Sequence, residues 1–143
     1  MSVAENKAIL ERFWGEIFNE GDVAVVDELV ATEYLNHDLV PGETPGSEGL
    51  KGFVLYLRNA FPDIHFDIEQ MVAEDDLVVS RWQSTATHRG EFMGIPPTGI
   101  SAGLNGMAIH RVENGKIVEA WNNWDALGLL TALGAIPQSG DGE

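Results

Sequence analysis

The sequence predicts an α+β domain in which helices cover one face of a curved, mostly antiparallel sheet. In the first part of the chain, apolar residues recur at helical spacing. From Ile64 onward the apolar period changes to two, which is typical of half-buried strands. These strand-like runs follow one another directly, and one apolar helical segment comes after them. Helices segregated from strands favour an α+β fold, and a curved sheet covered by helices leaves a space where pockets form.

The first helix has clear signals at both ends. Ser2 and Glu5 have the spacing of a capping box, in which each side chain satisfies a free amide of the first turn. Apolar residues then recur at helical spacing as far as Phe18. Gly21 follows, and it is expected just past the helix end because glycine adopts a left-handed conformation without strain.

Two more helices are expected before the sheet. Asp22 is a candidate cap for a short second helix, and Ser47 for a third helix that Pro62 ends. The segment 33–38 between them is expected to be extended. Residues 40–47 contain two prolines and two glycines, so we expect a loop there and predict that it forms a mobile flap over a pocket.

Four long strands are expected from the period-two runs, over residues 64–69, 77–88, 100–112 and 116–123. The last two strands meet at Asn114-Gly115, the pair most typical of a tight hairpin turn. Gly103 and Gly106 are expected to form bulges or bends within their strand. Asp125 then opens a short C-terminal helix, where aspartate is a good cap.

Composition limits the classes of function. The chain has 143 residues and a formal charge of −15, which argues against binding nucleic acid or an anionic membrane surface. It has no cysteine, so disulfides and thiolate metal sites are excluded. The four histidines lack the spacing of a local metal site, and no metal is expected. We expect one domain over residues 1–137 with a flexible tail over 138–143. Because no signal peptide or membrane span is recognisable, we expect a cytoplasmic protein.

Several polar and aromatic residues are candidates for a pocket at the end of the sheet. Trp121, Asn122 and Asp125 follow one another at the end of the last expected strand, and His110 lies on the preceding strand. His37 and His88 are expected at loop edges, where they are candidates for lining the pocket mouth.

The sequence resembles the SnoaL-like polyketide cyclases of the nuclear transport factor 2-like superfamily. The resemblance extends from about Asn6 to Gly134 and rests on several short motifs. These are Phe13-Trp14, Phe18-Asn19-Glu20-Gly21-Asp22, Asn36-His37-Asp38, Thr87-His88, Gly90-Glu91-Phe92-Met93-Gly94-Ile95-Pro96-Pro97-Thr98-Gly99, Glu113-Asn114-Gly115-Lys116 and Trp124-Asp125.

This resemblance implies a cone-shaped sheet wrapped by three N-terminal helices and a short C-terminal helix, often assembled as a homodimer or homotetramer. It also implies intramolecular aldol closure of a hydrophobic polyketide-like carbonyl compound, with neither metal nor organic cofactor. By position, Asp125 is similar to the family's catalytic aspartate and His110 to its histidine, while Trp14 and Asn36 match substrate-binding positions. One departure is Ala120, where many relatives have histidine.

Alternatives remain open at this stage. Asp125 is either the acid/base or only the cap of the terminal helix, and the two roles are compatible. The fold also hosts epoxide hydrolases and isomerases. However, Arg81 is the only arginine expected in the interior of a strand, away from its ends, and Ala108 stands where an inward acid would be wanted. The third alternative is a non-catalytic domain that binds a small molecule, because fold does not fix function.

Overall fold

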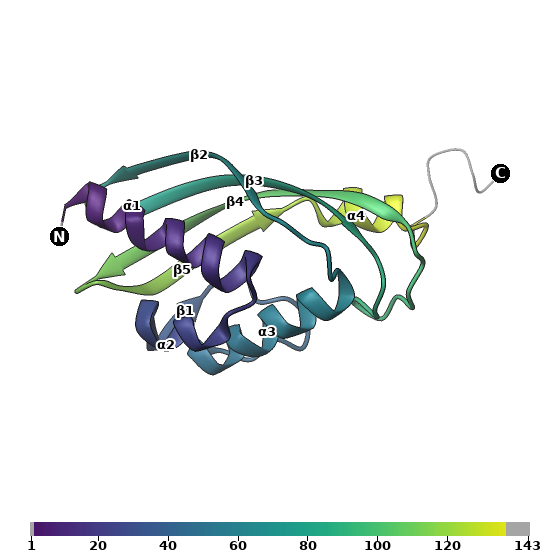
Figure 1. Ribbon diagram of the computed structural model, residues 1–143, viewed down its shortest axis with the longest axis horizontal. Helices are drawn as coiled ribbons and strands as arrows, with labels where there is room; N and C mark the ends of the chain where they lie inside the picture. The colour runs from purple at the N-terminus through teal and green to yellow at the C-terminus, as the bar shows by residue number, and fades with distance from the viewer. Residues whose placement is uncertain (1, 137–143) are drawn as a thin grey trace.

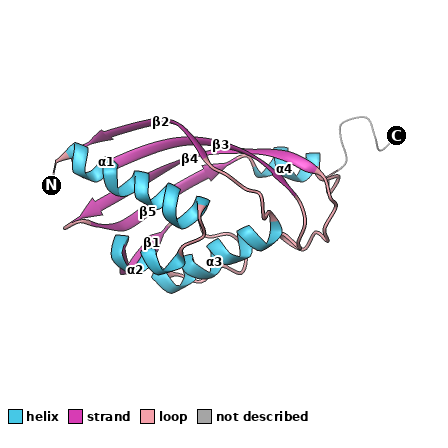
Figure 2. Ribbon diagram, in the orientation of Figure 1, coloured by secondary structure: helices cyan, strands magenta, loops and turns pink. Residues whose placement is uncertain are grey.

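A computed structural model describes residues 2–136 and shows a curved sheet with helices packed against one side (Figures 1 and 2). The expected tail, 138–143, lies outside the described residues. The elements in chain order are α1 (Val3–Arg12), the π-helical segment η1 (Phe13–Asn19), the 3₁₀ turn η2 (Val23–Val25), α2 (Val26–Leu29), β1 (Val30–Asn36), α3 (Gly46–Ala60), β2 (Asp67–Glu74), β3 (Leu77–Thr87), β4 (Ser101–Glu113), β5 (Lys116–Trp124) and α4 (Ala126–Ala132).

The sheet has five strands in the order β1-β5-β4-β3-β2. β1 runs parallel to β5, and the other neighbours are antiparallel. In Figure 1 α1 crosses one side of the sheet and α3 lies below it, while α4 sits at the far end. The predicted α+β class is therefore confirmed. The apolar residues of α1, η1 and α3 pack with the inward side chains of the strands in one core.

The local signals for the hairpin turn and for both ends of the first helix are confirmed. Asn114 and Gly115 both have positive φ, 51° and 79°, as the tight hairpin between β4 and β5 requires. Ser2 and Glu5 form the expected capping box, with Ser2 Oγ accepting from the Glu5 amide at 3.0 Å. Gly21 has a φ of 72° just past the end of η1.

The expected cap residues of the next two helices were wrong. Asp22 makes no side-chain capping hydrogen bond. The third helix begins at Gly46 after Pro45, and Ser47 lies buried inside its first turn. Pro45 fixes an extended entry into the helix, so the helix begins two residues earlier than a cap at Ser47 would require.

Strand details also differ from expectation. Ile64 and Phe66 are buried, as the alternation indicated, but β2 begins only at Asp67. Gly103 and Gly106 form no bulge, because β3 and β4 pair in unbroken register through both positions. Gly106 instead permits close packing, since a Cβ there would lie 2.7 Å from both the Asn123 carbonyl oxygen and the Trp82 ring. Among the described residues, no helix is long and apolar enough to cross a membrane.

Candidate functional site

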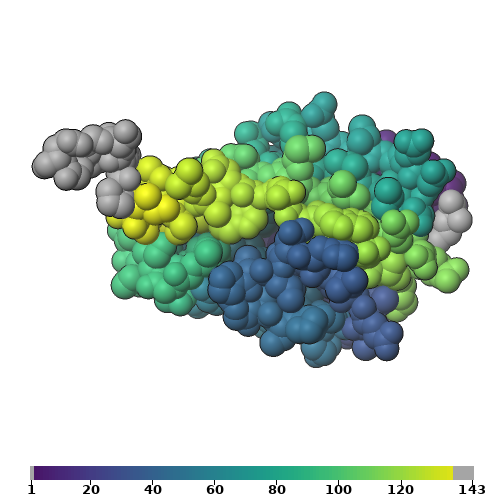
Figure 3. Space-filling model, turned by 180° about the vertical axis from the view of Figure 1, so that it is seen from behind, coloured from purple at the N-terminus to yellow at the C-terminus, as the bar shows by residue number. Residues whose placement is uncertain are grey.

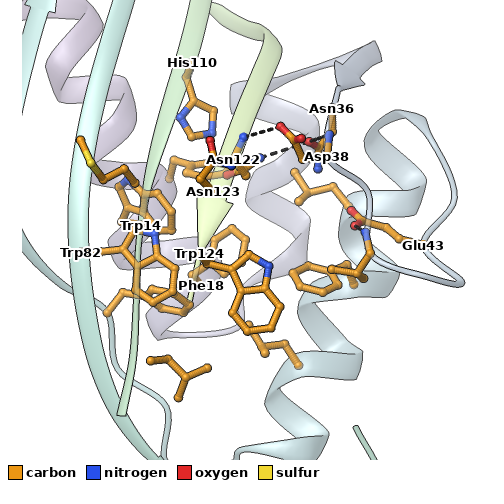
Figure 4. A pocket seen from close by; sticks show the side chains of 18 of the residues that line it. Trp14, Phe18, Asn36, Asp38, Glu43, Trp82, His110, Asn122, Asn123 and Trp124 are labelled. Carbon is orange, nitrogen blue, oxygen red and sulfur yellow. Dashed lines mark hydrogen bonds between the residues drawn. The ribbon is translucent and has the colours of Figure 1, made fainter. Parts of the chain in front are cut away.

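An apolar cavity lies between the inner face of the sheet and the helical segments η1 and α3. Aromatic and aliphatic side chains form most of its wall, and Figure 4 shows the indole rings of three of them around the space. The apolar lining residues are Phe13, Trp14, Phe18, Tyr34, Val40, Leu50, Phe53, Leu57, Ile64, Phe66, Trp82, Phe92, Leu104, Met107 and Trp124. The polar lining residues are Asn36, Asp38, Glu43, His110, Asn122 and Asn123.

The polar end of the cavity is built where β1 finishes beside β5. Asn36 pairs with Ala120 in the parallel ladder, which brings the chain after β1 next to the end of β5. Asn122 Nδ2 donates to Asn36 Oδ1 at 3.1 Å, and the Asn122 backbone amide donates to Asp38 Oδ2 at 2.8 Å. The Asp38 amide donates in turn to Asn36 Oδ1 at 2.9 Å. Figure 4 draws hydrogen bonds between these residues as dashed lines. Together they fix the side-chain amides of Asn36 and Asn122 at the cavity wall.

His110 projects from β4 into the aromatic part of the site. Its ring centroid lies 4.9 Å from that of Phe13 and 6.0 Å from that of Trp14. The side chain is 1% exposed, and burial lowers its pKa to about 3. The imidazole is therefore neutral near pH 7. Its Nδ1 has no hydrogen-bond partner among the described residues, so it presents an unused polar atom in an apolar setting.

Asp125 does not line this cavity. Its Oδ1 accepts a hydrogen bond from the Gly128 amide at 2.8 Å, which caps α4. A side chain at Gly128 would clash with this carboxylate, since a Cβ there would lie 2.1 Å from Asp125 Oδ2. Asp125 is exposed and borders a shallow hollow on the outer face of the sheet. The geometry supports the cap and gives no support to Asp125 as the acid/base of the cavity.

Two other expected binding residues meet on the outside of the sheet. The rings of His37 and Trp121 stack with centroids 4.9 Å apart and an interplanar angle of 10°. His37 Nε2 also lies 2.6 Å from Glu119 Oε2. Side chains alternate along β5, so Trp121 points outward while its neighbour Asn122 reaches the cavity. Neither His37 nor Trp121 is part of the cavity wall.

His88 is buried but also lies away from the cavity lining. Its Nδ1 lies 3.0 Å from Thr98 Oγ1 and accepts from the Thr98 amide at 3.3 Å. The ring packs on Phe61, with centroids 5.4 Å apart. These contacts attach the loop between β3 and β4 to the body of the protein, which is a structural role.

The structure thus brings together four of the eight expected site residues, namely Trp14, Asn36, His110 and Asn122. It adds two carboxyl groups that sequence reasoning missed, Asp38 and Glu43. Asp38 stands beside Asn36 in a family motif, and that adjacency was a usable signal. Glu43 lies in an irregular loop, where no periodicity indicates direction. Within the described residues, no group of three or more His, Asp or Glu side chains is placed to hold a metal ion.

Comparison with known proteins assigns the family. The family described as SnoaL-like polyketide cyclase matches residues 8–133, most of the chain. The chain belongs to this family. The comparison with curated proteins gave no match.

Solved structures of similar fold support the SnoaL-like assignment. TsrD from Streptomyces laurentii is 26% identical with a TM-score of 0.86, covering 95% of this chain and 99% of its own. AclR from Streptomyces galilaeus, titled a "putative hydroxylase", is 29% identical with a TM-score of 0.81, and the coverage is 95% and 100%. IdmH from Streptomyces antibioticus, titled a "putative polyketide cyclase", is 33% identical with a TM-score of 0.76, and the coverage is 90% and 98%.

Proposed function

We propose that this SnoaL-like protein is a cofactor-independent enzyme that binds a hydrophobic, polyketide-like carbonyl compound and closes a ring in it by acid/base catalysis. One observation carries the proposal. The cavity is apolar and aromatic along most of its wall, and its polar groups gather where β1 and β5 end. A pocket of this kind binds the apolar body of a ligand and orients its few polar atoms.

The polar end suits the chemistry of an intramolecular aldol reaction. A base removes a proton next to one carbonyl, and the resulting enolate carbon attacks a second carbonyl in the same molecule. The new alkoxide then takes up a proton. The amide of Asn122 is held by Asn36, and neutral His110 offers polarity without charge. Cavity carboxyl groups supply the proton-transfer function that this reaction needs.

A hydroxylase is the second candidate, because the chain is similar to AclR as well as to IdmH. Both reactions can begin with removal of a proton next to a carbonyl. The carbanion then attacks a second carbonyl in a cyclase. In a hydroxylase it bonds to dioxygen and forms a hydroperoxide, which a two-electron reductant must convert into the alcohol and water. Mass spectrometry of the product separates them. Ring closure leaves the mass unchanged or lowers it by one water, whereas hydroxylation adds one oxygen atom.

Epoxide hydrolysis has less support from the geometry. Arg81 lies on the outside of the sheet, where it pairs with Glu69 at 3.0 Å and Gln70 at 2.9 Å. Ala108 is buried at the inward position where an acid would be wanted. A non-catalytic binding role would use the same cavity without proton transfer. Measuring deuterium exchange next to the ligand carbonyl therefore distinguishes such a role from that of an enzyme.

Binding and proton transfer can be tested on the same sample. We expect 1-tetralone, a bicyclic aryl ketone, to shift the indole N–H signal of Trp14, which lines the cavity, and to leave that of Trp121 on the outer face. In deuterated buffer the enzyme should then speed deuterium incorporation next to the carbonyl, followed by NMR. Binding without faster exchange would favour the non-catalytic role. A shift of Trp121 alone would place the ligand outside the cavity and contradict the proposal.

We also propose that the chain self-associates through the outer face of its sheet. Val72 on β2 is 60% exposed there, and Met107 and Ile109 on β4 are 49% and 38% exposed; only β3 lies between these two strands. Exposed apolar surface of this kind marks interfaces. Light scattering at micromolar concentration should show a dimer or larger assembly, and Ile109→Glu should shift it toward monomer. A monomeric wild-type protein would contradict the proposal.

A further inference from the structure

Glu43 is a cavity-lining carboxyl group that none of the contacts described above employs. It lies on the loop between β1 and α3, and Figure 4 shows its carboxyl end beside the cavity, on the same side as Asn36. In Figure 3 this blue part of the surface lies against the yellow-green surface of β5. Glu43 Oε1 accepts from the Val40 amide at 3.1 Å, and the Glu43 amide donates to the Val40 carbonyl oxygen at 3.0 Å. The reciprocal pair holds the side chain in place.

Burial raises the pKa of Glu43, while hydrogen bonds from Val40 and Asn36 oppose the shift. A carboxyl group whose pKa moves toward neutrality becomes a stronger base when ionised and still gives up its proton readily. Such a group can serve both proton transfers of an aldol closure. Asn36 connects Glu43 to the polar end of the cavity, since Asn36 Oδ1 also accepts a hydrogen bond from Asn122 Nδ2.

The other titratable groups of the cavity suit this task less well. Asp38 is exposed and already accepts the Asn122 backbone amide at 2.8 Å, so it joins β1 to β5. Burial raises the pKa of the Tyr34 hydroxyl, and the nearby charge of Glu43 adds to that effect, so Tyr34 remains a neutral phenol. His110 stays neutral because burial lowers its pKa. Glu43 is left as the partly desolvated carboxylate with access to the cavity.

We propose that Glu43 is the residue that moves the proton in this cavity; this rests on the proposed function. The Glu43 carboxylate takes a proton from the carbon next to a ligand carbonyl. The C–H bond breaks, its electron pair enters the enolate, and an O–H bond forms on Glu43. The enolate carbon then bonds to a second carbonyl carbon, whose π pair moves onto oxygen. That alkoxide takes the proton back, and Glu43 returns to its ionised state.

The test compares Glu43→Gln with a matched control, Glu48→Gln. Glu48 lies nearby in the first turn of α3, but its side chain is 79% exposed and it pairs with Lys51 outside the cavity. Glutamine at position 43 keeps the acceptor for the Val40 amide and cannot take up the proton. We expect Glu43→Gln to bind 1-tetralone within about twofold of wild type, by the Trp14 signal, and to lose about 10²–10⁴ in the rate of deuterium exchange. Glu48→Gln should match wild type.

A second readout does not depend on turnover. The carboxyl carbon signal of Glu43, identified by its loss in Glu43→Gln, should titrate above the ordinary glutamate range. Its midpoint should rise further when 1-tetralone fills the cavity, because the ligand removes water from the carboxylate. The exchange rate of wild type should rise with pH through the same midpoint.

The outcomes separate the two proposals. The role of Glu43 is overturned if Glu43→Gln keeps the wild-type rate of deuterium exchange, or if Asp38→Asn loses it instead. Either result leaves the proposed function standing. A wild-type protein that binds 1-tetralone without accelerating exchange overturns both. The role of Glu43 is also overturned if its carboxyl carbon signal titrates in the ordinary glutamate range and its midpoint does not change when 1-tetralone binds.

Discussion

Gly49→Ala is expected to destabilise the protein by about 1–3 kcal/mol, although alanine is the better helix former. Gly49 lies in α3, where the preceding loop folds back onto the helix. A Cβ at this position would lie 1.7 Å from the Thr44 carbonyl oxygen and 2.8 Å from Thr44 Oγ1. Backbone atoms cannot turn aside as a flexible side chain can, so the loop must leave the helix. Urea unfolding followed by circular dichroism measures the loss.

Gly52→Ala is the matched control. Gly52 belongs to the same helix, is exposed, and has no atom within 4 Å of its ideal Cβ position. Alanine there should stabilise the protein by about 0.5–1 kcal/mol through helix propensity alone. If the two variants were equally stable, close packing of the loop on α3 would not be what Gly49 provides.

The same contact bears on the loop that carries Glu43. Residues 40–47 were expected to be a mobile flap, and this stays a prediction. The loop is held at Thr44 against Gly49 and by the reciprocal bonds of Val40 and Glu43. Releasing Thr44 should therefore disturb the Glu43 carboxyl, and Gly49→Ala should change its titration where Gly52→Ala does not.

The fold was predictable because its signals are local. Asn114-Gly115 fixes a hairpin through φ angles that these two residues tolerate, and Ser2 with Glu5 closes a helix end within four residues of chain. The α+β class followed from the sequence order, in which apolar residues first recur at helical spacing and then, from Ile64, at every second residue. Bulges were wrongly expected at Gly103 and Gly106, because sequence does not show that Gly106 is needed for the close approach of Trp82.

The site was less predictable because the direction of a side chain depends on tertiary pairing. Trp121 and Asn122 are adjacent in sequence, yet only Asn122 reaches the cavity, since neighbours on a strand face opposite sides. Asp125 follows β5, and the turn into α4 takes its carboxylate to Gly128. Glu43 lies in a loop whose position depends on packing against α3, and no periodic pattern records that contact.

The stability of the wild-type protein is expected to fall between pH 7 and pH 5 by about 2 kcal/mol more than that of His110→Leu. In the folded protein burial lowers the pKa of His110 to about 3, from an ordinary value of 6.5. Below pH 6.5 the unfolded chain takes up a proton at this residue, while the folded protein does not until pH falls toward 3. The proton therefore favours the unfolded state across this range. The contribution is fully present above pH 6.5 and is lost as pH decreases.

Leucine is similar in size to histidine, so the variant still packs against Phe13 and Trp14. Because leucine does not titrate, the variant removes the proton uptake at this position. Every other ionisable group is common to both proteins, so its effect cancels in the difference. Urea titrations at pH 7, 6 and 5 give the free energy of unfolding for each protein. Parallel curves would mean that His110 is hydrated or paired when folded, and the neutral polar group on which the proposed site depends would be absent.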